Sequence, residues 1–504
     1  MLSAEKAFAQ GRYPDAERAL SVALLEAEKF GPQDLRLATN LSNLGELSRA
    51  LAKYARAEVL LKRSLSIYEK VLGPNHPEVA THLNNLALLY TSQGKNDQAL
   101  VLLKRSVAIK EKTLSPNHED LATGLANLGE LYRVLGKYGQ AEPLLKRSLA
   151  IRDKLPAPSR ELAANVNNLA GLYVSLGKYK EAEPLHKRAL TIAEKSSGPN
   201  HPDVAVNLSN LASVYRKQGR YSEAEPLQKR AVAIHEKVLG PNHPDVAVTV
   251  SNLAAIYEDQ GKYAEAAPLF LRCLEINEQG PNKTHLANSL SHVANLYELQ
   301  GKYSEAEPLL LRALMIDETA LGSNHPELAK DLNGLAMLYQ KQRKYAQAEP
   351  LYIRALGLKE ATLGPNHPDV ASALNNLGEN YRVQGKYEQA EPMYKRSSEI
   401  LITTFGPKHI ALASTLSNLG LLYTTQGRCD EAEALFNRSL AIKEEVLGPN
   451  HDEVATTLTN LVGLYFSQRQ YEKAEPLQKR SLAITEKTLG PNSPVALTNQ
   501  KNYV

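Results

Sequence analysis

The stretch Gly240-Pro241-Asn242-His243-Pro244-Asp245-Val246-Ala247 recurs unchanged at residues 198–205 and 364–371. Around it runs a longer unit, which reads Leu-x-Asn-Leu-Ala/Gly-x-x-Tyr, then Gly-Lys-Tyr, then Ala-Glu-Pro-Leu-x-Lys-Arg. The third position of the Gly-Lys-Tyr element falls at residues 13, 54, 96, 138, 179, 221, 263, 303, 345, 387, 429 and 471. A fixed period of about 42 residues is typical of a stacked repeat array.

One unit, residues 205–246, predicts two helices. Leu208, Leu211, Ala212 and Tyr215 follow the i, i+3, i+4, i+7 spacing of one helix face. Gly219 is expected to end that helix, and a second helix with its own apolar face follows. Pro226 is expected near the start of the second helix, where proline removes no helical hydrogen bond. Gly240-Pro241 then stops that helix, and Pro244-Asp245 begins the next one.

A helix pair of this kind cannot bury its apolar face alone, so stacking must supply the core. The fold class expected is all-α, a right-handed α-solenoid of about twelve antiparallel helix pairs. Residues 1–504 are expected to form one solenoid, with a truncated repeat over 1–31 and an incomplete repeat or cap over 491–504. Each repeat is expected to touch only its neighbours, so that conformational changes spread along the array as in a spring.

Composition narrows the class of protein. The 59 basic and 55 acidic residues give a net charge of +4, without the concentrated basic face of a nucleic-acid binder. Cys273 and Cys429 lie several repeats apart, so a structural disulfide is not expected and a reducing compartment fits. No run reaches the ~20 apolar residues of a membrane span. We expect a cytoplasmic protein without cofactor or membrane partner, and a monomer.

The elements Asn-Leu-Ala-x-x-Tyr, Gly-Lys-Tyr and Glu-Ala resemble the tetratricopeptide (TPR) repeat. The 42-residue length and the Leu-Gly-Pro-Asn-His-Pro-Asp-Val-Ala connector are similar to those of the kinesin light chain subclass. The resemblance covers about residues 1 to 495 and implies a TPR superhelix. No stretch here matches the heptad coiled coil with which kinesin light chains grip the motor, so a motor role is not expected.

Nine connector histidines recur once per repeat: His76, His118, His201, His243, His285, His325, His367, His409 and His451. Metal ligands must converge within a few ångström, whereas repeats are spaced by ~10 Å, so we predict no metal site. These side chains are instead expected to pack against or hydrogen-bond the neighbouring connector. The chain also lacks a phosphate-binding loop, an HExxH motif and a nucleophile elbow, so an enzyme is not expected.

A ladder of asparagines precedes the central leucine of most first helices. In TPR domains that hold extended peptides, asparagine at this site faces the groove, and one amide can both donate to and accept from a peptide backbone. The alternative is that these side chains bond within the helix array. The ladder comprises Asn43, Asn85, Asn127, Asn168, Asn210, Asn252, Asn376, Asn418 and Asn460, with His292 and Gly334 at the two remaining positions.

By the same analogy, charged residues after the helix tyrosine point into the groove. They are Arg49, Arg133, Arg216, Lys217, Glu258, Glu298 and Arg382. The arginines suit carboxylates, which predicts a partner with an acidic segment for the first half and a basic one for the acidic centre. The alternative is solvated surface charge.

Two columns lie on the second helices. An arginine recurs from Arg63 to Arg480, and its regularity predicts pairing with the acids of the Glu-Ala-Glu segment; a nucleic-acid stripe is the alternative. The neighbouring lysine column is interrupted by Leu271, Leu311 and Ile353, which predict an apolar contact patch unless they pack locally.

The function expected is a non-catalytic scaffold that binds an extended peptide or protein segment in its concave groove. Two alternatives remain open at this point. One is a ligand-sensing regulatory module of a larger signalling system. The other is a structural protein that assembles with itself through Leu271, Leu311 and Ile353.

Overall fold

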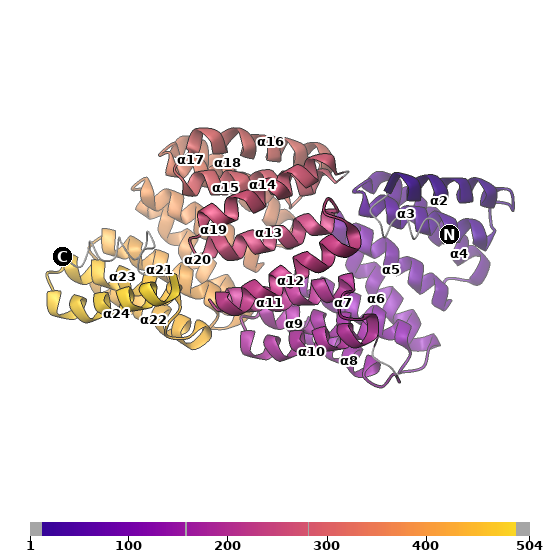
Figure 1. Ribbon diagram of the computed structural model, residues 1–504, viewed down its shortest axis with the longest axis horizontal. Helices are drawn as coiled ribbons and strands as arrows, with labels where there is room; N and C mark the ends of the chain where they lie inside the picture. The colour runs from indigo at the N-terminus through magenta and orange to yellow at the C-terminus, as the bar shows by residue number, and fades with distance from the viewer. Residues whose placement is uncertain (1–12, 157–158, 281, 490–504) are drawn as a thin grey trace.

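The computed structural model describes residues 13–156, 159–280 and 282–489, and this part of the chain folds into helices with no strand. The helices form pairs that wind into a superhelix, with the N-terminal repeats at the right and the C-terminal repeats at the left of Figure 1. The prediction of an all-α repeat solenoid is confirmed. The truncated first repeat and the incomplete last one stay predictions, because residues 1–12 and 490–504 lie outside the described residues.

Each pair consists of a first and a second helix. The first helices are α3 (Leu35–Ala50), α5 (Pro77–Ser92), α7 (Glu119–Val134), α9 (Arg160–Ser175), α11 (Pro202–Lys217), α13 (Pro244–Asp259), α15 (Lys283–Leu299), α17 (Leu328–Lys341), α19 (Pro368–Val383), α21 (Ile410–Thr425) and α23 (Asp452–Ser467). The second helices are α2 (Tyr13–Glu28), α4 (Tyr54–Leu72), α6 (Asn96–Thr113), α8 (Tyr138–Arg152), α10 (Tyr179–Ser197), α12 (Tyr221–Leu239), α14 (Tyr263–Gln279), α16 (Tyr303–Leu321), α18 (Tyr345–Leu363), α20 (Tyr387–Phe405), α22 (Cys429–Leu447) and α24 (Tyr471–Leu489).

The connector ends one helix and begins the next, as predicted. Gly240 terminates α12 at a φ of 92°, a backbone conformation that glycine adopts without steric cost. His243 is the N-cap of α13, and its Nδ1 accepts a hydrogen bond from the backbone N–H of Asp245 at 3.1 Å. Pro244 follows in the first turn. The same histidine bond caps α5, α7, α11, α19, α21 and α23.

This capping role differs from the expected one. We predicted that the connector histidines contact the neighbouring connector, whereas all except His285, which lies inside α15, accept from the backbone N–H two residues further along their own chain segment. The reason is local geometry, because an extended residue directly before a helix places its side chain over the free N–H groups of the first turn.

The prediction for Pro226 was also wrong in position. It lies inside α12, where the five residues from Tyr221 to Glu225 already precede it. A proline there leaves the carbonyl of Ser222 without its helical donor. Both residues are exposed, so water can satisfy that carbonyl and the helix continues.

Stacking builds the core along the whole array. Leu208 and Ala212 on α11 are fully buried against α12, where Ala224 and Ala231 are fully buried too. Such small residues on second helices allow the close approach of the helix axes. Each first helix also packs on the second helix of the preceding pair, so that every repeat closes the core of its neighbour.

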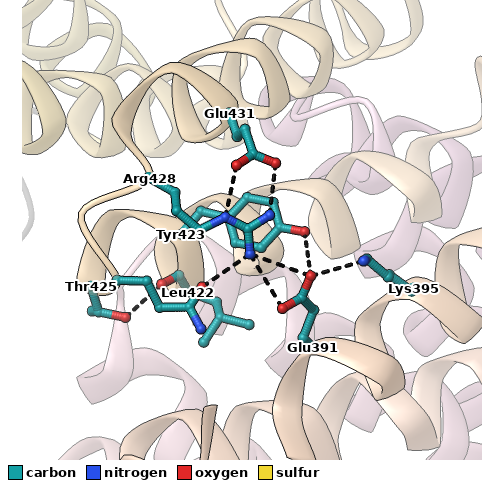
Figure 2. Close-up of polar contacts among 8 residues, drawn as sticks. Glu391, Lys395, Leu422, Tyr423, Thr425, Arg428 and Glu431 are labelled. Atoms are coloured by element: carbon teal, nitrogen blue, oxygen red, sulfur yellow. Dashed lines mark hydrogen bonds and ion pairs between the residues drawn. The ribbon is translucent and has the colours of Figure 1, made fainter. Parts of the chain in front are cut away.

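A polar clasp joins consecutive pairs and explains several recurring residues. In Figure 2, Glu391 of α20 accepts hydrogen bonds from the Tyr423 hydroxyl at 2.9 Å and from Arg428 at 3.3 Å. Lys395 lies 2.8 Å from the same carboxylate, and its hydrogen bond lowers the pKa of Glu391. The Arg428 guanidinium also stacks 3.5 Å from the Tyr423 ring centroid and pairs with Glu431. Equivalent clasps form at Glu58, Glu183, Glu225 and Glu307.

The arginine column pairs differently from the prediction. Arg230 contacts Glu194 at 2.8 Å, and Arg272 contacts Glu236 at 2.6 Å. These acids lie in the last turns of the preceding second helix rather than in the Glu-Ala-Glu segment. Arg230 also donates to the carbonyl of Pro199 in the connector. The column therefore ties each second helix to the preceding helix end.

Contacts also reach across one turn of the superhelix, so the expectation that each repeat touches only its neighbours was wrong. Nε2 of His367 lies 2.8 Å from the carbonyl oxygen of Val134, 233 residues away. Tyr138 stacks on Phe405 with ring centroids 5.1 Å apart. The pitch of the superhelix is small enough to bring later connectors onto earlier helix ends, which the period alone does not reveal.

In the part of the chain that the structure describes, the helices are too short or too polar to cross a lipid bilayer.

Candidate functional site on the concave face

The first helices line the concave face. Neighbouring first helices contact one another along the array, for example α9 with α11 and α11 with α13. No comparable contact joins neighbouring second helices within the described residues. Helices that approach each other more closely lie on the inside of the curve, so the second helices form the convex face.

The asparagine ladder on this face divides into two groups. The side-chain amides of Asn85, Asn127 and Asn418 donate to the preceding repeat, with distances of 3.4 Å to Ser42, 2.8 Å to Asn84 and 3.2 Å to Asn375. Those three side chains bond within the array. The remaining six have no hydrogen-bond partner among the described residues: Asn43, Asn168, Asn210, Asn252, Asn376 and Asn460.

Three of the unbonded asparagines are consecutive, on α9, α11 and α13. Asn168 and Asn210 are half-buried and Asn252 is exposed, so their amides are open to the concave side. The residues one turn before them are Ala164, Val206 and Val248, of which Val206 is 48% and Val248 49% exposed.

The residues one turn after the same asparagines are Gly171, Ser213 and Ala255. All three are small, and none is fully buried. Small side chains on both sides of the amides leave space for another chain against this surface. We name the surface formed by Asn168, Asn210, Asn252 and these neighbours the central groove.

Most of the predicted groove charges have a partner in the same or the next first helix. Three arginines bind the acid one turn earlier, Arg49 with Glu46, Arg133 with Glu130 and Arg382 with Glu379, at 3.0, 2.5 and 2.6 Å. Glu298 is buried and contacts Lys341 at 2.8 Å. Glu258 accepts a hydrogen bond from Asn295 at 2.7 Å.

One cation at the end of α11 stands apart. Arg216 pairs with Asp259 at 3.2 Å, but the Lys217 ammonium has no hydrogen-bond or ion-pair partner among the described residues. Desolvation in the concave face and the neighbouring Arg216 lower the pKa of Lys217. Desolvation likewise raises the pKa of Glu258 and of Asp259. Charges at this end of α11 and α13 are therefore partly desolvated and interact more strongly than charges in open solvent.

A cavity of about 280 Å³ opens at the end of the central groove, between α13 and α15. Val248, Asn252 and His292 contribute to its wall. The Nδ1 of His292 lies 3.0 Å from the Ser251 hydroxyl, and desolvation lowers the pKa of this histidine. The ladder position that carries histidine instead of asparagine thus borders a space large enough for one side chain.

Leu271, Leu311 and Ile353 lie on three successive second helices, with exposed fractions of 47%, 45% and 48%. They are on the convex side and are not brought together with the asparagine ladder. No group of three metal-binding side chains converges within the residues that the structure describes.

The sequence analysis did not single out the small residues of the central groove. A signal for them exists, because Ala164, Val206 and Val248 precede the asparagines by one helical turn and therefore share their face. A further signal distinguishes Asn168. Asn127 donates to Asn84 in the preceding repeat, whereas the equivalent position for Asn168 is Ala126, which has no polar side chain. Without a polar partner in the preceding repeat, the amide of Asn168 remains unbonded.

Comparison with known proteins agrees with the repeat architecture. A tetratricopeptide repeat family model matches nine overlapping stretches, at residues 3–70, 36–112, 78–154, 161–234, 203–279, 285–361, 329–403, 369–445 and 411–487. A search of curated proteins gives no match.

Three solved structures are similar to the chain. A Podosopora anserina putative kinesin light chain with nearly identical TPR-like repeats is 28% identical, with a TM-score of 0.35, over 41% of this chain and 97% of that one. BtubC (BKLC) from P. vanneervenii is 22% identical, with a TM-score of 0.39, over 45% and 92%. A Rap protein complexed with Competence and Sporulation Factor is 16% identical, with a TM-score of 0.50, over 73% and 99%, and this likeness concerns the fold alone. The family matches extend over most of the chain, which therefore belongs to the tetratricopeptide repeat family, with repeats similar to those of kinesin light chain-like proteins.

Proposed function

We propose that this protein is a non-catalytic scaffold that binds an extended segment of a partner protein in the central groove. The observation that carries the proposal is the run of three unbonded amides, Asn168, Asn210 and Asn252, on consecutive first helices. A carboxamide without a partner inside the array offers both a donor and an acceptor to a peptide backbone.

The spacing of the amides suits an extended chain. Packed helices lie ~10 Å apart, and an extended peptide advances roughly 3.3 Å per residue. Each asparagine would then meet about every third residue of the partner. The small side chains at Ala164, Gly171 and Ser213 leave room for the backbone to approach the amides.

The charge at the end of α11 favours an acidic group in the partner. Lys217 has no carboxylate partner among the described residues, whereas most other groove charges are paired. A partner carboxylate placed there would form an ion pair in a partly desolvated environment, where such pairs are stronger than at an open surface.

The experiment is affinity capture from the native lysate, with quantitative mass spectrometry of the retained proteins. The test variant is the triple Asn168→Ala, Asn210→Ala, Asn252→Ala. The matched control is the triple Asn85→Ala, Asn127→Ala, Asn418→Ala, which removes asparagines that bond within the array. Circular dichroism establishes that both variants keep their helix content.

We expect the test variant to lose the partners that the wild-type protein retains, and the control to keep them. Equal retention by both variants would contradict the central groove as the binding site. A wild-type protein that retains no partner above background would contradict the scaffold itself.

A further inference from the structure

Three histidines connect successive turns of the superhelix. The Nε2 atom of His325 lies 3.3 Å from the carbonyl oxygen of Ser92. The corresponding distances are 2.8 Å between His367 and Val134, and 3.2 Å between His409 and Ser175. The paired residues are 233 or 234 positions apart. In each histidine Nδ1 accepts the backbone N–H two residues later, so Nε2 carries the proton that it donates.

The glycine that follows each accepting helix, and Gly219 after α11, fits against a connector of the next turn. A Cβ on Gly94 would lie 2.8 Å from Pro326, and one on Gly136 would lie 2.9 Å from Pro368, both closer than real Cβ contacts. Cβ atoms on Gly177 and Gly219 would lie 3.3 and 3.1 Å from the rings of His409 and His451. Four successive repeats therefore meet the next turn of the superhelix at van der Waals distance. We name these four contacts the seam.

The equivalent glycines of later repeats show that this closeness does not come from the repeat itself. Gly261, Gly301, Gly385 and Gly427 have the same positive φ, between 71° and 76°. A Cβ on any of them would meet no described atom within 4 Å. As far as the described residues show, these glycines serve the helix end alone, whereas Gly94 and Gly136 also admit a connector from the following turn.

Aromatic stacking adds to the seam at its centre. The rings of Tyr138 and Phe405 stack across the turn at 5.1 Å, and Phe405 stacks on His409 at 3.8 Å with an angle of 8° between their planes. The imidazole of His409 is thus fixed on three sides, by the helix that it caps, by the carbonyl of Ser175 and by Phe405.

We propose that the seam holds consecutive superhelical turns together and fixes the pitch of the solenoid, so that the protein is a closed coil rather than an extensible spring. A solenoid stabilised only by neighbour contacts changes pitch through small rotations at every interface. A contact between residues more than 230 positions apart opposes the sum of those rotations. The seam thereby also holds α9, α11 and α13 at a constant curvature.

The test removes the cross-turn bond and keeps the helix cap. Asparagine is a good N-cap, and Asn282 of this chain caps α15 by accepting from Thr284. Its side chain is too short to reach the earlier turn. The test variant is His367→Asn with His409→Asn, and the matched control is His118→Asn with His201→Asn, which cap helices without a cross-turn bond among the described residues.

Small-angle X-ray scattering of the full chain reports the outcome. We expect the His367/His409 variant to increase in radius of gyration and maximum dimension, with unchanged helix content by circular dichroism. The His118/His201 variant should scatter like the wild-type protein. The same scattering from all three proteins would overturn the proposal.

A second pair of variants tests the same contact from the glycine side. The test variant, Gly94→Ala with Gly136→Ala, inserts methyl groups against Pro326 and Pro368. The control, Gly385→Ala with Gly427→Ala, has the same backbone strain from a positive φ, but its methyl groups meet no described atom. Only the first pair should expand the protein. Equal expansion in both pairs would show that strained helix ends, and not the seam, determine the dimensions.

Discussion

Two buried carboxylates face each other where α16 packs on α17, namely Asp317 and Asp331, with exposed fractions of 0% and 2%. Lys330 Nζ lies 3.3 Å from Asp317. None of the four carboxylate oxygens accepts a hydrogen bond from the described residues. Burial, and then the charge of Asp317, raise the pKa of Asp331 to about 7 against the counteracting Lys330, so that Asp331 titrates near neutral pH and is fully protonated only at lower pH.

This pair predicts a loss of stability with rising pH. The folded protein binds the Asp331 proton more tightly than the unfolded chain does, so the free energy of unfolding falls as the pH rises from about 4 through 7. Asp331→Asn removes that dependence. We expect the free energy of unfolding of the variant to exceed that of the wild-type protein by roughly 1–3 kcal/mol at pH 8 and by little at pH 4. Urea denaturation at both pH values measures this, and an equal difference at both would contradict the assignment.

His186 predicts the opposite dependence. It is buried on α10, where its Nδ1 lies 2.9 Å from Asn167, and burial lowers its pKa to about 4. The unfolded chain then binds a proton that the folded protein does not, so stability is complete above about pH 6.5 and falls as the pH drops towards 4.

The chain provides the substitution that tests this. Gln228 occupies the equivalent position of α12 and donates to the carbonyl of Thr249 at 2.8 Å. We expect His186→Gln to be more stable than the wild-type protein by roughly 1–2 kcal/mol at pH 5 and similar to it at pH 8. Thermal melts at the two pH values provide the comparison. A variant that is less stable by the same amount at both pH values would show that His186 contributes only packing.

Among the elements, two second helices have an incomplete clasp, α6 with Leu100 and α14 with Ala267 at the position of the glutamate. In α14, Ala267 replaces the glutamate that accepts from tyrosine and lysine in most other repeats, and Tyr297 and Lys302 of the next repeat keep only their mutual contact, 5.8 Å from ammonium to ring centroid. In the complete clasp at Glu225, the Tyr257 hydroxyl donates at 3.1 Å. The site of Ala267 is half-buried.

Ala267→Glu is therefore expected to stabilise the contact between α14 and α15. One hydrogen bond and one partly exposed ion pair contribute about 0.5–1 kcal/mol together. Hydrogen exchange by mass spectrometry should show slower exchange in α14 and α15 with little change in α22. Slower exchange along the whole array, or none in α14, would contradict a local clasp.

Helix positions could be predicted from the sequence because their signals are local. Gly240 and Pro244 act within a few residues, and the i, i+3, i+4, i+7 pattern through Leu208, Leu211, Ala212 and Tyr215 describes one face. The ladder could be placed on a first helix, but the pattern could not separate Asn127 from Asn210. Whether an amide has a hydrogen-bond partner depends on its neighbours in three dimensions. For example, the side chain of Asn167 is hydrogen-bonded to His186 and Asn207.

At the scale of the whole molecule, the pitch of the superhelix determines which distant repeats come into contact, and the repeat period alone does not predict this. Each neighbour interface contributes a small rotation, and only their sum brings His367 onto Val134. In Figure 1 the helices from α14 to α18 lie at the top of the coil, between the N-terminal repeats at the right and the C-terminal repeats at the left. The winding also brings charges of the following turn near the ends of α11 and α13. Desolvation lowers the pKa of Lys217 and Glu453 acts against it, whereas desolvation and, to a smaller extent, Asp452 both raise the pKa of Asp259.

Site-specific photo-crosslinking in the native lysate tests most directly which face binds the partner. The crosslinking residue replaces Ser213, exposed in the central groove on α11, or Ala233, exposed on the second helix α12. We predict that position 213 yields covalent adducts with the captured partner and that position 233 does not. Adducts from position 233 alone, or equally from both positions, would contradict a scaffold that binds its partner on the concave face.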